Sequence, residues 1–164
     1  ALSILTEEDF FHGHNQFLID VKAITKLPII RKDFMIDEYQ IYEAKLIGAD
    51  CILLIASILS DQEITEFVTV AEKLELDYLI EVHDEDELRR VEHFGDAMIG
   101  VNNRNLKTFE VDLSNSINLK KIYEGNNTFV AESGIRNQKD IDTLKQHHIH
   151  AFLIGESLMK GDFA

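Results

Sequence analysis

Short apolar runs alternate with amphipathic stretches along the whole chain. We expect β-strands at the apolar runs, which lie at residues 2–5, 27–30, 51–56, 78–82, 98–101, 129–131 and 151–155. Between them, apolar residues recur at helical spacing, as at Phe67, Val70, Ala71 and Leu74. The runs begin about 25 residues apart, which is the size of one strand–helix unit in a parallel sheet. The pattern therefore predicts consecutive βα units.

The ends of the predicted helices agree with this pattern. Asp84 is followed by three acidic residues, which suit an N-cap and the first turn of a helix. Gly48 and Gly95 stand in turns before the next apolar runs. Nearly continuous apolar strands indicate a sheet that is covered on both faces. Such units form either a doubly wound sheet or a barrel, and periodicity alone does not distinguish the two.

Polar clusters at the ends of the apolar runs favour the barrel. In a (β/α)8 barrel, functional groups come from the carboxyl ends of several different strands and meet at one mouth. Nearly every run in this chain ends in such a cluster: Thr6-Glu7, Arg31-Lys32-Asp33, Ser57, Glu81 with His83, Asn102-Asn103-Arg104, Glu132-Ser133-Gly134 and Gly155-Glu156-Ser157. We therefore expect an α/β protein of the (β/α)8 TIM-barrel class with its site at these ends.

The composition is that of a folded, acidic protein. The chain has 164 residues, and its 30 acidic and 16 basic residues give a formal net charge of −14. This charge disfavours nucleic acid as a partner, although a few well-placed donors can still hold a small anion. No apolar stretch is long enough to span a bilayer, and no signal-peptide pattern opens the sequence. We expect a cytoplasmic protein without membrane contact.

Cysteine and histidine residues point away from metal or thiol chemistry. The single cysteine, Cys51, excludes an internal disulfide and lies inside an apolar run, which favours a buried, inert thiol. No histidine has a convincing metal-ligand spacing with a carboxylate, so we expect no metal. His83 shares a strand face with Glu81, and we interpret it as a cap or as support for that residue. Five others are interpreted as surface residues: His12, His14, His147, His148 and His150.

Lys32 and Glu81 are the candidates for acid–base chemistry. Lys32 lies on the same strand face as Ile30 and Phe34 because side chains alternate along a strand. Glu81 interrupts an apolar run, where a carboxylate must be paired, protonated or functional. A lysine and a glutamate in one desolvated cavity supply the opposed proton roles of general acid–base catalysis. A structural Lys–Glu ion pair is the alternative, and the residues alone do not decide between them.

Two glycine-containing turns follow the last two apolar runs. In barrels, backbone N–H groups of such turns commonly bind a phosphate. Ser133-Gly134 and Gly155-Glu156-Ser157 stand at these positions. A single Ser-Gly pair is usually only a turn, but the two together favour a phosphorylated small-molecule substrate.

Six motifs give the chain a resemblance to indole-3-glycerol phosphate synthases, in order and in spacing. The motifs are LSILTE, LPIIRKDFMIDEYQIYEA, LIEVHDEDEL, IGVNNRNLKTFEVD, VAESGI and AFLIGESLM. The resemblance covers essentially the whole chain, and RKDF together with NNRNLKTF is its most specific part. It implies a carbon–carbon lyase (carboxy-lyase) of tryptophan biosynthesis with a TIM-barrel fold and no cofactor. The implied reaction converts 1-(2-carboxyphenylamino)-1-deoxyribulose 5-phosphate to indole-3-glycerol phosphate, carbon dioxide and water.

The resemblance also implies roles for individual residues. Lys32 matches the general acid, Glu81 the base or proton shuttle of the dehydration, and Asn102 the residue that orients the reacting groups. Residues matching the walls and edges of the anthranilate pocket are Phe34, Leu53, Arg104, Leu106, Glu132 and Ser133. Residues falling on the phosphate-binding turns are Ser133, Gly134, Gly155 and Glu156, the last through its backbone.

The chain matches only part of the family. It corresponds to the second through eighth strands, so we expect a single, partial barrel domain over residues 1–164 that lacks the first strand and most of the last helix. Open barrel edges would promote association of a truncated chain. Two other functions remain open: a related phosphate-binding barrel such as phosphoribosylanthranilate isomerase, and a non-catalytic fragment that only binds phosphate. The isomerase chemistry would require a Cys/Asp pair at strand ends, whereas Cys51 begins its strand.

Overall fold

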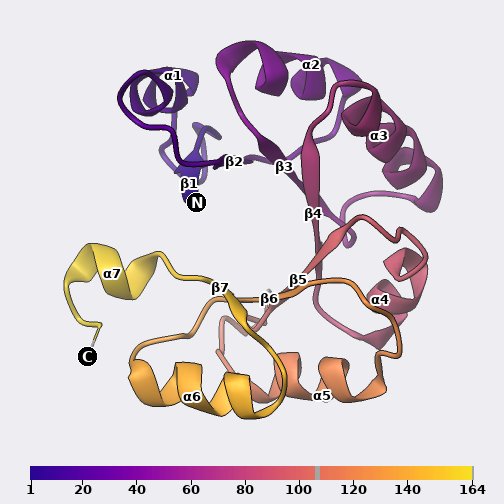
Figure 1. Cartoon of the computed structure of the whole chain (residues 1–164), viewed down its shortest axis with the longest axis vertical. Helices are drawn as coiled ribbons and strands as arrows, with labels where there is room; N and C mark the ends of the chain where they lie inside the picture. The colour runs from indigo at the N-terminus through magenta and orange to yellow at the C-terminus, as the bar shows by residue number, and fades with distance from the viewer. Residues whose placement is uncertain (106–107, 164) are drawn as a thin grey trace. The chain divides into compact units, whose positions relative to one another are not determined.

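The computed structural model describes residues 1–105 and 108–163, in which seven strands alternate with seven helices (Figure 1). The strands are β1 (Leu2–Leu5), β2 (Ile29–Lys32), β3 (Cys51–Ile55), β4 (Asp77–Val82), β5 (Met98–Asn102), β6 (Phe129–Glu132) and β7 (Ala151–Leu153). The helices are α1 (Asn15–Ile24), α2 (Glu38–Ile47), α3 (Asp61–Lys73), α4 (Glu85–Val91), α5 (Ser114–Ile122), α6 (Gln138–Gln146) and α7 (Glu156–Lys160). The sheet order follows the chain from β1 to β7.

The chain forms two compact units, residues 1–80 and 81–164, and the boundary falls inside β4. In the first unit, β1 pairs with β2 and β2 with β3, both in parallel. All five residues of β3 are buried, as expected of a strand covered on both faces. Helix α2 packs against α3. The core of this unit is built from aliphatic side chains that include Leu18, Ile29, Ile41, Ile52, Leu54 and Ile64.

The second unit repeats the same pattern. Strand β5 pairs in parallel with β6, and β6 with β7, so that Asn102 lies opposite Glu132 and Glu132 opposite Leu153. The carboxyl ends of β5, β6 and β7 therefore lie side by side, which is where parallel α/β proteins place functional groups. Buried aliphatic side chains of this unit include Leu88, Ile99, Val101, Leu144 and Ile149.

Local sequence signals determine where the helices begin and end. Asp37 and Ser60 form capping boxes with Gln40 and Glu63, and these boxes begin α2 and α3. Asp84 caps α4 by accepting a hydrogen bond from the backbone N–H of Glu87, as the acidic cluster predicted. Helix α2 ends at Gly48, whose φ of 97° lies in the left-handed region that glycine adopts without strain.

The predicted parallel βα fold is confirmed, and the described residues supply seven of the eight strands of a (β/α)8 barrel. Each of these seven strands begins and ends within two residues of its predicted run. Strand β2 is displaced at both ends: it extends through Arg31 and Lys32, beyond the run predicted at 27–30. The single-domain prediction for residues 1–164 stays a prediction. No helix in the described part of the chain is both long and apolar enough to cross a membrane.

Candidate active site

Strand β2 separates the polar residues of its motif onto two faces. Arg31 and Asp33 are buried, whereas Lys32 and Phe34 are only half-buried. This difference follows from the alternation of side chains along a strand, which turns neighbouring residues to opposite sides. Lys32 ends the strand on the same face as Ile30 and Phe34, as the sequence predicted. Lys32 therefore stands at the carboxyl end of a strand, the position of catalytic groups in barrels.

The sequence placed Arg31 in the ring of polar groups at the strand ends, but the structure buries it, and it anchors this strand end. Its Nε donates to the Thr6 hydroxyl at 3.0 Å, and its Nη1 donates to the Gln40 carbonyl at 2.9 Å. Its Nη2 lies 3.2 Å from Asp33 Oδ2 and 2.7 Å from Glu43 Oε2. The Thr6 hydroxyl also donates to Asp33 Oδ2 at 2.6 Å. This buried network joins β1, β2 and α2, and it holds the backbone on both sides of Lys32.

An aromatic cluster surrounds Phe34, which shares a strand face with Lys32. The Phe34 ring stacks on Phe11 with their centroids 5.1 Å apart, and it meets Phe10 edge-on at 5.9 Å. Phe10 and Phe11 belong to the loop after β1, which the sequence analysis did not single out. Their only sequence signal is a pair of adjacent aromatic residues directly after a predicted strand. Leu53, the other predicted apolar wall, is 1% exposed in β3.

Glu7 shapes the loop that carries these rings. Its carboxylate accepts hydrogen bonds from the backbone N–H groups of Asp9, Phe10 and Phe11, at 2.7 to 3.0 Å. Desolvation alone would raise the pKa of Glu7, but these three hydrogen bonds lower it overall. The loop is closed by Gly13 N–H, which donates to the Glu7 carbonyl at 2.8 Å, and it returns to β1 where His14 N–H donates to the Leu5 carbonyl at 3.2 Å. A side chain at Gly13 would overlap the Leu5 carbonyl, so glycine is required there.

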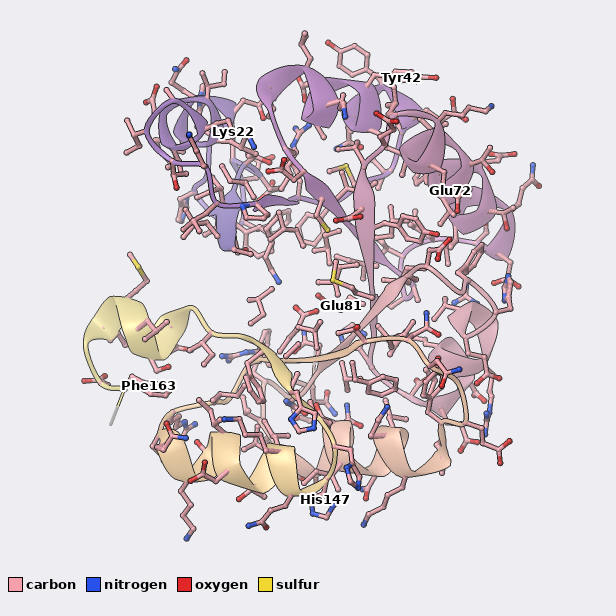
Figure 2. The ribbon with its side chains drawn as sticks, viewed as in Figure 1. Lys22, Tyr42, Glu72, Glu81, His147 and Phe163 are labelled. Atoms are coloured by element: carbon pink, nitrogen blue, oxygen red, sulfur yellow. The ribbon has the colours of Figure 1, made fainter. Side chains whose placement is uncertain are left out.

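The carboxyl end of β4 carries a carboxylate and an imidazole in contact (Figure 2 labels Glu81). Glu81 is 5% exposed, and its Oε1 lies 3.3 Å from His83 Nε2. On its other side, His83 Nδ1 lies 3.2 Å from Glu87 Oε2. The same Glu87 oxygen accepts the backbone N–H of His83 at 2.8 Å. The imidazole is thus held between two carboxylates, one from β4 and one from α4.

The two carboxylates determine the charge of His83. Burial disfavours the imidazolium, but the interactions with Glu81 and Glu87 outweigh burial and raise the pKa of His83 to about 9. His83 is therefore a cation at neutral pH, and both of its ring nitrogens carry protons. The contact with Glu81 is consistent with the strand face that the two residues share, and the supporting role of His83 stays a prediction.

Asn102, at the end of β5, donates from Nδ2 to Glu81 Oε1 at 3.0 Å. Its Oδ1 accepts the backbone N–H of Arg104 at 3.0 Å, which determines which end of the amide faces Glu81. Asn115 of α5 donates to the carbonyls of His83 and Asn102, at 3.0 and 3.1 Å, and ties the two strand ends together. The structure thus brings together Glu81, His83 and Asn102.

Asn103, unlike its neighbour Asn102, is buried and makes hydrogen bonds that connect strand ends to a helix. It is 3% exposed, and its Nδ2 donates to the carbonyls of Glu132 and Ser133, at 3.0 and 3.3 Å. Its Oδ1 accepts from the backbone N–H and the hydroxyl of Ser116, at 3.1 and 2.7 Å. Asn103 therefore anchors the ends of β5 and β6 to α5. Glu132 itself ends β6 and is 1% exposed.

The two predicted phosphate turns differ in the space around their glycines. Ser133 and Gly134 both have positive φ, 63° and 78°, and a side chain at Gly134 would overlap Val111. Glycine is therefore required at position 134 both by its positive φ and by the side chain of Val111, which lies between β5 and α5. At Gly155, which caps α7, a Cβ would meet no heavy atom of the described residues within 4 Å. The Gly155 backbone thus presents an open face, which suits the close approach of a ligand.

Arg104 links the loop after β5 to the turn after β7. Its Nη2 lies 3.0 Å from Glu156 Oε2, and Lys160 Nζ lies 2.7 Å from Glu156 Oε1. Lys160 and Arg104 lower the pKa of Glu156. The Glu156 side chain is thus engaged with two cations, which is compatible with a backbone role for this residue at the turn. Leu106, predicted beside Arg104, lies outside the described residues.

The predicted site residues fall into the two units. Lys32, Phe34 and Leu53 belong to the first unit, and all the others to the second. The proximity of Lys32 to Glu81 therefore stays a prediction. The sequence analysis did not single out Phe11, and it considered Glu7 only as part of a polar cluster and Glu87 only as an acidic residue of a first helical turn. Within residues 1–105 and 108–163, no group of three or more His, Cys, Asp or Glu side chains is placed to hold a metal ion.

Comparison with known sequences points to one family. The family model described as indole-3-glycerol phosphate synthase matches residues 1–163. A relative carrying that name from Ruminiclostridium cellulolyticum is 51% identical over 160 residues, which cover 98% of this chain and 62% of that protein. Another, from Legionella pneumophila strain Lens, is 46% identical over 162 residues, or 99% and 63% of the two chains. The chain thus spans about three fifths of the length of the curated relatives it matches.

Comparison with solved structures identifies the fold. The 3-hexulose-6-phosphate synthase of Salmonella typhimurium aligns with a TM-score of 0.79 at 11% identity, over 96% of this chain and 78% of that one. A chain of the tryptophan synthase α2β2 complex of Pyrococcus furiosus aligns with a TM-score of 0.67 at 15% identity, over 90% and 62%. At these identities the likeness concerns the fold alone.

Proposed function

The chain belongs to the indole-3-glycerol phosphate synthase family, and on that premise we propose that its protein forms indole-3-glycerol phosphate from 1-(2-carboxyphenylamino)-1-deoxyribulose 5-phosphate. Carbon dioxide and water would be the other products. The observation that carries the proposal is the buried Glu81 carboxylate, held by Asn102 and His83 at the end of β4. A buried ionisable group that is oriented by two partners at a strand end is what acid–base catalysis in a barrel requires.

Lys32 is the proposed general acid. Ring closure joins the ketone carbon of the substrate to the aromatic carbon that bears the carboxylate. When the Lys32 ammonium donates a proton to the ketone oxygen, the ketone carbon becomes more electrophilic and bonds to the aromatic carbon. Loss of carbon dioxide from that aromatic carbon then restores aromaticity. The oxygen leaves as water in the following dehydration. The cationic lysine also offsets negative charge in a site that receives a phosphate and a carboxylate.

Glu81 is the proposed base of the dehydration. It would accept the proton that is lost when the ring double bond forms, while Lys32 assists the departing hydroxyl. Asn102 would orient the reacting groups, because its amide is held by both Glu81 and the Arg104 backbone.

The remaining residues would bind the two ends of the substrate. We assign the anthranilate side to Phe34, Leu53, Arg104, Leu106, Glu132 and Ser133, and we add Phe11 because its ring stacks on Phe34. The phosphate is assigned to the turns Ser133-Gly134 and Gly155-Glu156. The open face of the Gly155 backbone supports this assignment. The phosphorylated small molecule is the partner proposed, and the cytoplasm is the proposed location.

A chimera provides the direct test. In the chimera, this chain replaces the matching 160 residues of the Ruminiclostridium cellulolyticum relative, and the rest of the chimera is the relative's own sequence. Incubation with the carboxyphenylamino-deoxyribulose phosphate should then give the fluorescence of an indole product. Lys32→Ala should reduce turnover at least about a hundredfold, the lower end of what general acid–base catalysis contributes. Lys26→Ala, at an exposed lysine before β2, is the matched control and should leave turnover unchanged.

The outcomes separate the parts of the proposal. No indole from a folded chimera overturns the function. Product formation that survives Lys32→Ala removes Lys32 from the mechanism but leaves the activity. The 164-residue chain alone, assayed in parallel, shows whether these residues suffice for turnover. The isomerase alternative is disfavoured by Cys51, because it begins β3 and burial raises the pKa of its thiol to about 12, far from that of a proton donor at neutral pH.

A further inference from the structure

The imidazole of His83 is largely buried, although the residue lies in the turn between β4 and α4. It follows β4 directly, its side chain is 14% exposed, and the side chains facing it come from three elements. Glu81 of β4 and Glu87 of α4 are the charged neighbours within the second unit, at 3.3 and 3.2 Å. The neutral amide of Asn102 in β5 shares Glu81 Oε1 with it.

Glu87 controls the orientation of the imidazole. One carboxylate oxygen, Oε2, both accepts the backbone N–H of His83 at 2.8 Å and lies 3.2 Å from Nδ1 of its ring. Glu87 is in turn fixed at the start of α4, because its own backbone N–H donates to the Asp84 cap at 2.9 Å. With Nδ1 directed at Glu87, the opposite nitrogen Nε2 lies 3.3 Å from Glu81 Oε1, an ion-pair contact without the alignment of a hydrogen bond. The ring can therefore transmit the position and the charge of Glu87 to Glu81.

We propose that His83 is a positioning residue for Glu81: fixed by Glu87, it is a permanent imidazolium that holds the Glu81 carboxylate ionised and oriented for proton transfer. The inference rests on the proposed function, in which Glu81 is the base of the dehydration. Its physical basis is that a buried carboxylate is costly when alone and stabilised when a cation and a hydrogen-bond donor meet the same oxygen. Asn102 supplies the donor and His83 the cation.

The alternative is that the three residues only stabilise the fold. A structural cluster would affect the free energy of unfolding but would not change kcat or its pH dependence selectively. The test must therefore read the charge of His83 directly and must compare catalytic effects with effects on stability. Glu87 is the residue to change, because its described contacts are with His83 and with the cap of α4. Glu87→Gln keeps the shape of the side chain and one acceptor oxygen.

The experiment uses the chimera with carbon-13-labelled histidine, and His83→Gln identifies the His83 resonance. Its NMR titration should give a pKa near 9 in the parent. Glu87→Gln should lower that value by about one to three pH units, the effect of removing a nearby opposite charge. Glu85→Gln is the matched control: it removes the same charge from the same helical turn, but Glu85 faces Arg89 at 3.3 Å and its side chain is 58% exposed. It should leave the His83 titration unchanged.

Kinetics of the same variants test the catalytic consequence. Glu87→Gln should lower kcat about tenfold, within the range that supporting interactions contribute, with KM nearly unchanged. The acid limb of the pH profile of kcat, which reports protonation of the base Glu81, should move to higher pH, because a weakened cation at His83 stabilises the Glu81 carboxylate less. His83→Gln should lower kcat similarly, and the double variant should cost no more than His83→Gln alone, because both changes break one chain of contacts.

The failures are distinguishable. If Glu81→Gln leaves turnover intact, the proposed role of Glu81 is wrong. If Glu81→Gln abolishes turnover while Glu87→Gln behaves like Glu85→Gln in kcat, in pH profile and in the His83 titration, the positioning role is overturned and the proposed function stands. Effects of Glu87→Gln on urea stability without any effect on kcat would likewise assign the cluster to the fold alone.

Discussion

Replacing Arg31 by methionine should destabilise the protein strongly, although Arg31 is outside the proposed chemistry. Methionine has a similar length and keeps the apolar stem of the side chain, but it removes the guanidinium. That group makes contacts with Thr6, Gln40 and Asn15 and with the carboxylates of Asp33 and Glu43. The variant therefore isolates the contribution of the charged head.

The expected loss follows from the burial of what is left behind. Asp33 is 6% exposed, so its carboxylate would remain in the interior with only the Thr6 hydroxyl and the Phe34 backbone N–H described as donors. Removing one partner of a buried ion pair costs about 3–5 kcal/mol. The Glu43 side chain is 25% exposed and can regain water, so it adds little to this figure. We expect a loss of about 4 kcal/mol.

Equilibrium unfolding of the chimera in urea, followed by circular dichroism, measures this loss. With a typical denaturant slope, the midpoint should fall by about 2 M. Arg31→Met combined with Asp33→Asn should recover part of the loss, because the second change removes the uncompensated charge. Arg136→Met, at an exposed arginine, is the control. An Arg31→Met midpoint equal to that of the control would refute the reasoning.

Three further predictions follow from the second unit. The pKa of His83 is raised from 6.5 to about 9 on folding, so its stabilisation is full below pH 6.5 and is lost as the pH rises through 9; it amounts to roughly 3 kcal/mol. Urea midpoints of the chimera should fall over this range and should fall less in His83→Gln; parallel curves would contradict this. Gly155→Leu should raise KM about tenfold, some 1.4 kcal/mol of binding, and change kcat less, because its side chain enters an open face; an unchanged KM would count against the phosphate assignment. Gly134→Ala should cost at least about 1–2 kcal/mol by thermal unfolding, since φ is 78° and Val111 occupies the space, and a neutral result would disprove that requirement.

Much of the fold could be predicted because hydrophobic periodicity reflects burial directly. The run at 51–56 became β3 (Cys51–Ile55), and the run at 78–82 became β4 (Asp77–Val82). The strand at 27–30 was placed too early because Arg31 and Lys32 are charged. The burial of Arg31 depends on partners from β1, α1 and α2, and a window along the sequence contains none of these together.

The candidate site shows the same division. The contact of Glu81 with His83 follows from a spacing of two residues along one strand, so alternation predicted it. The contact of His83 with Glu87 depends on the direction in which α4 leaves β4, and Arg104 meets Glu156 from 52 positions away. Neither has a local sequence signal. Asn102 and Asn103 are adjacent residues of the same type. Their different burial distinguishes Asn102, which contacts Glu81, from Asn103, which is 3% exposed and anchors the strand ends.

The alternation of anchors and site residues has a consequence for directed evolution. At the end of β2, positions 31 and 33 hold the scaffold and positions 32 and 34 face the predicted site; at the end of β5, position 103 holds the scaffold between 102 and 104. A library that randomises the whole RKDF or NNR segment would mix the two kinds of position, and most inactive clones would be insoluble and chemically uninformative. A library restricted to positions 34 and 104 would vary substrate preference while leaving intact both the folding determinants at 31, 33 and 103 and the proposed chemistry of Lys32 and Asn102.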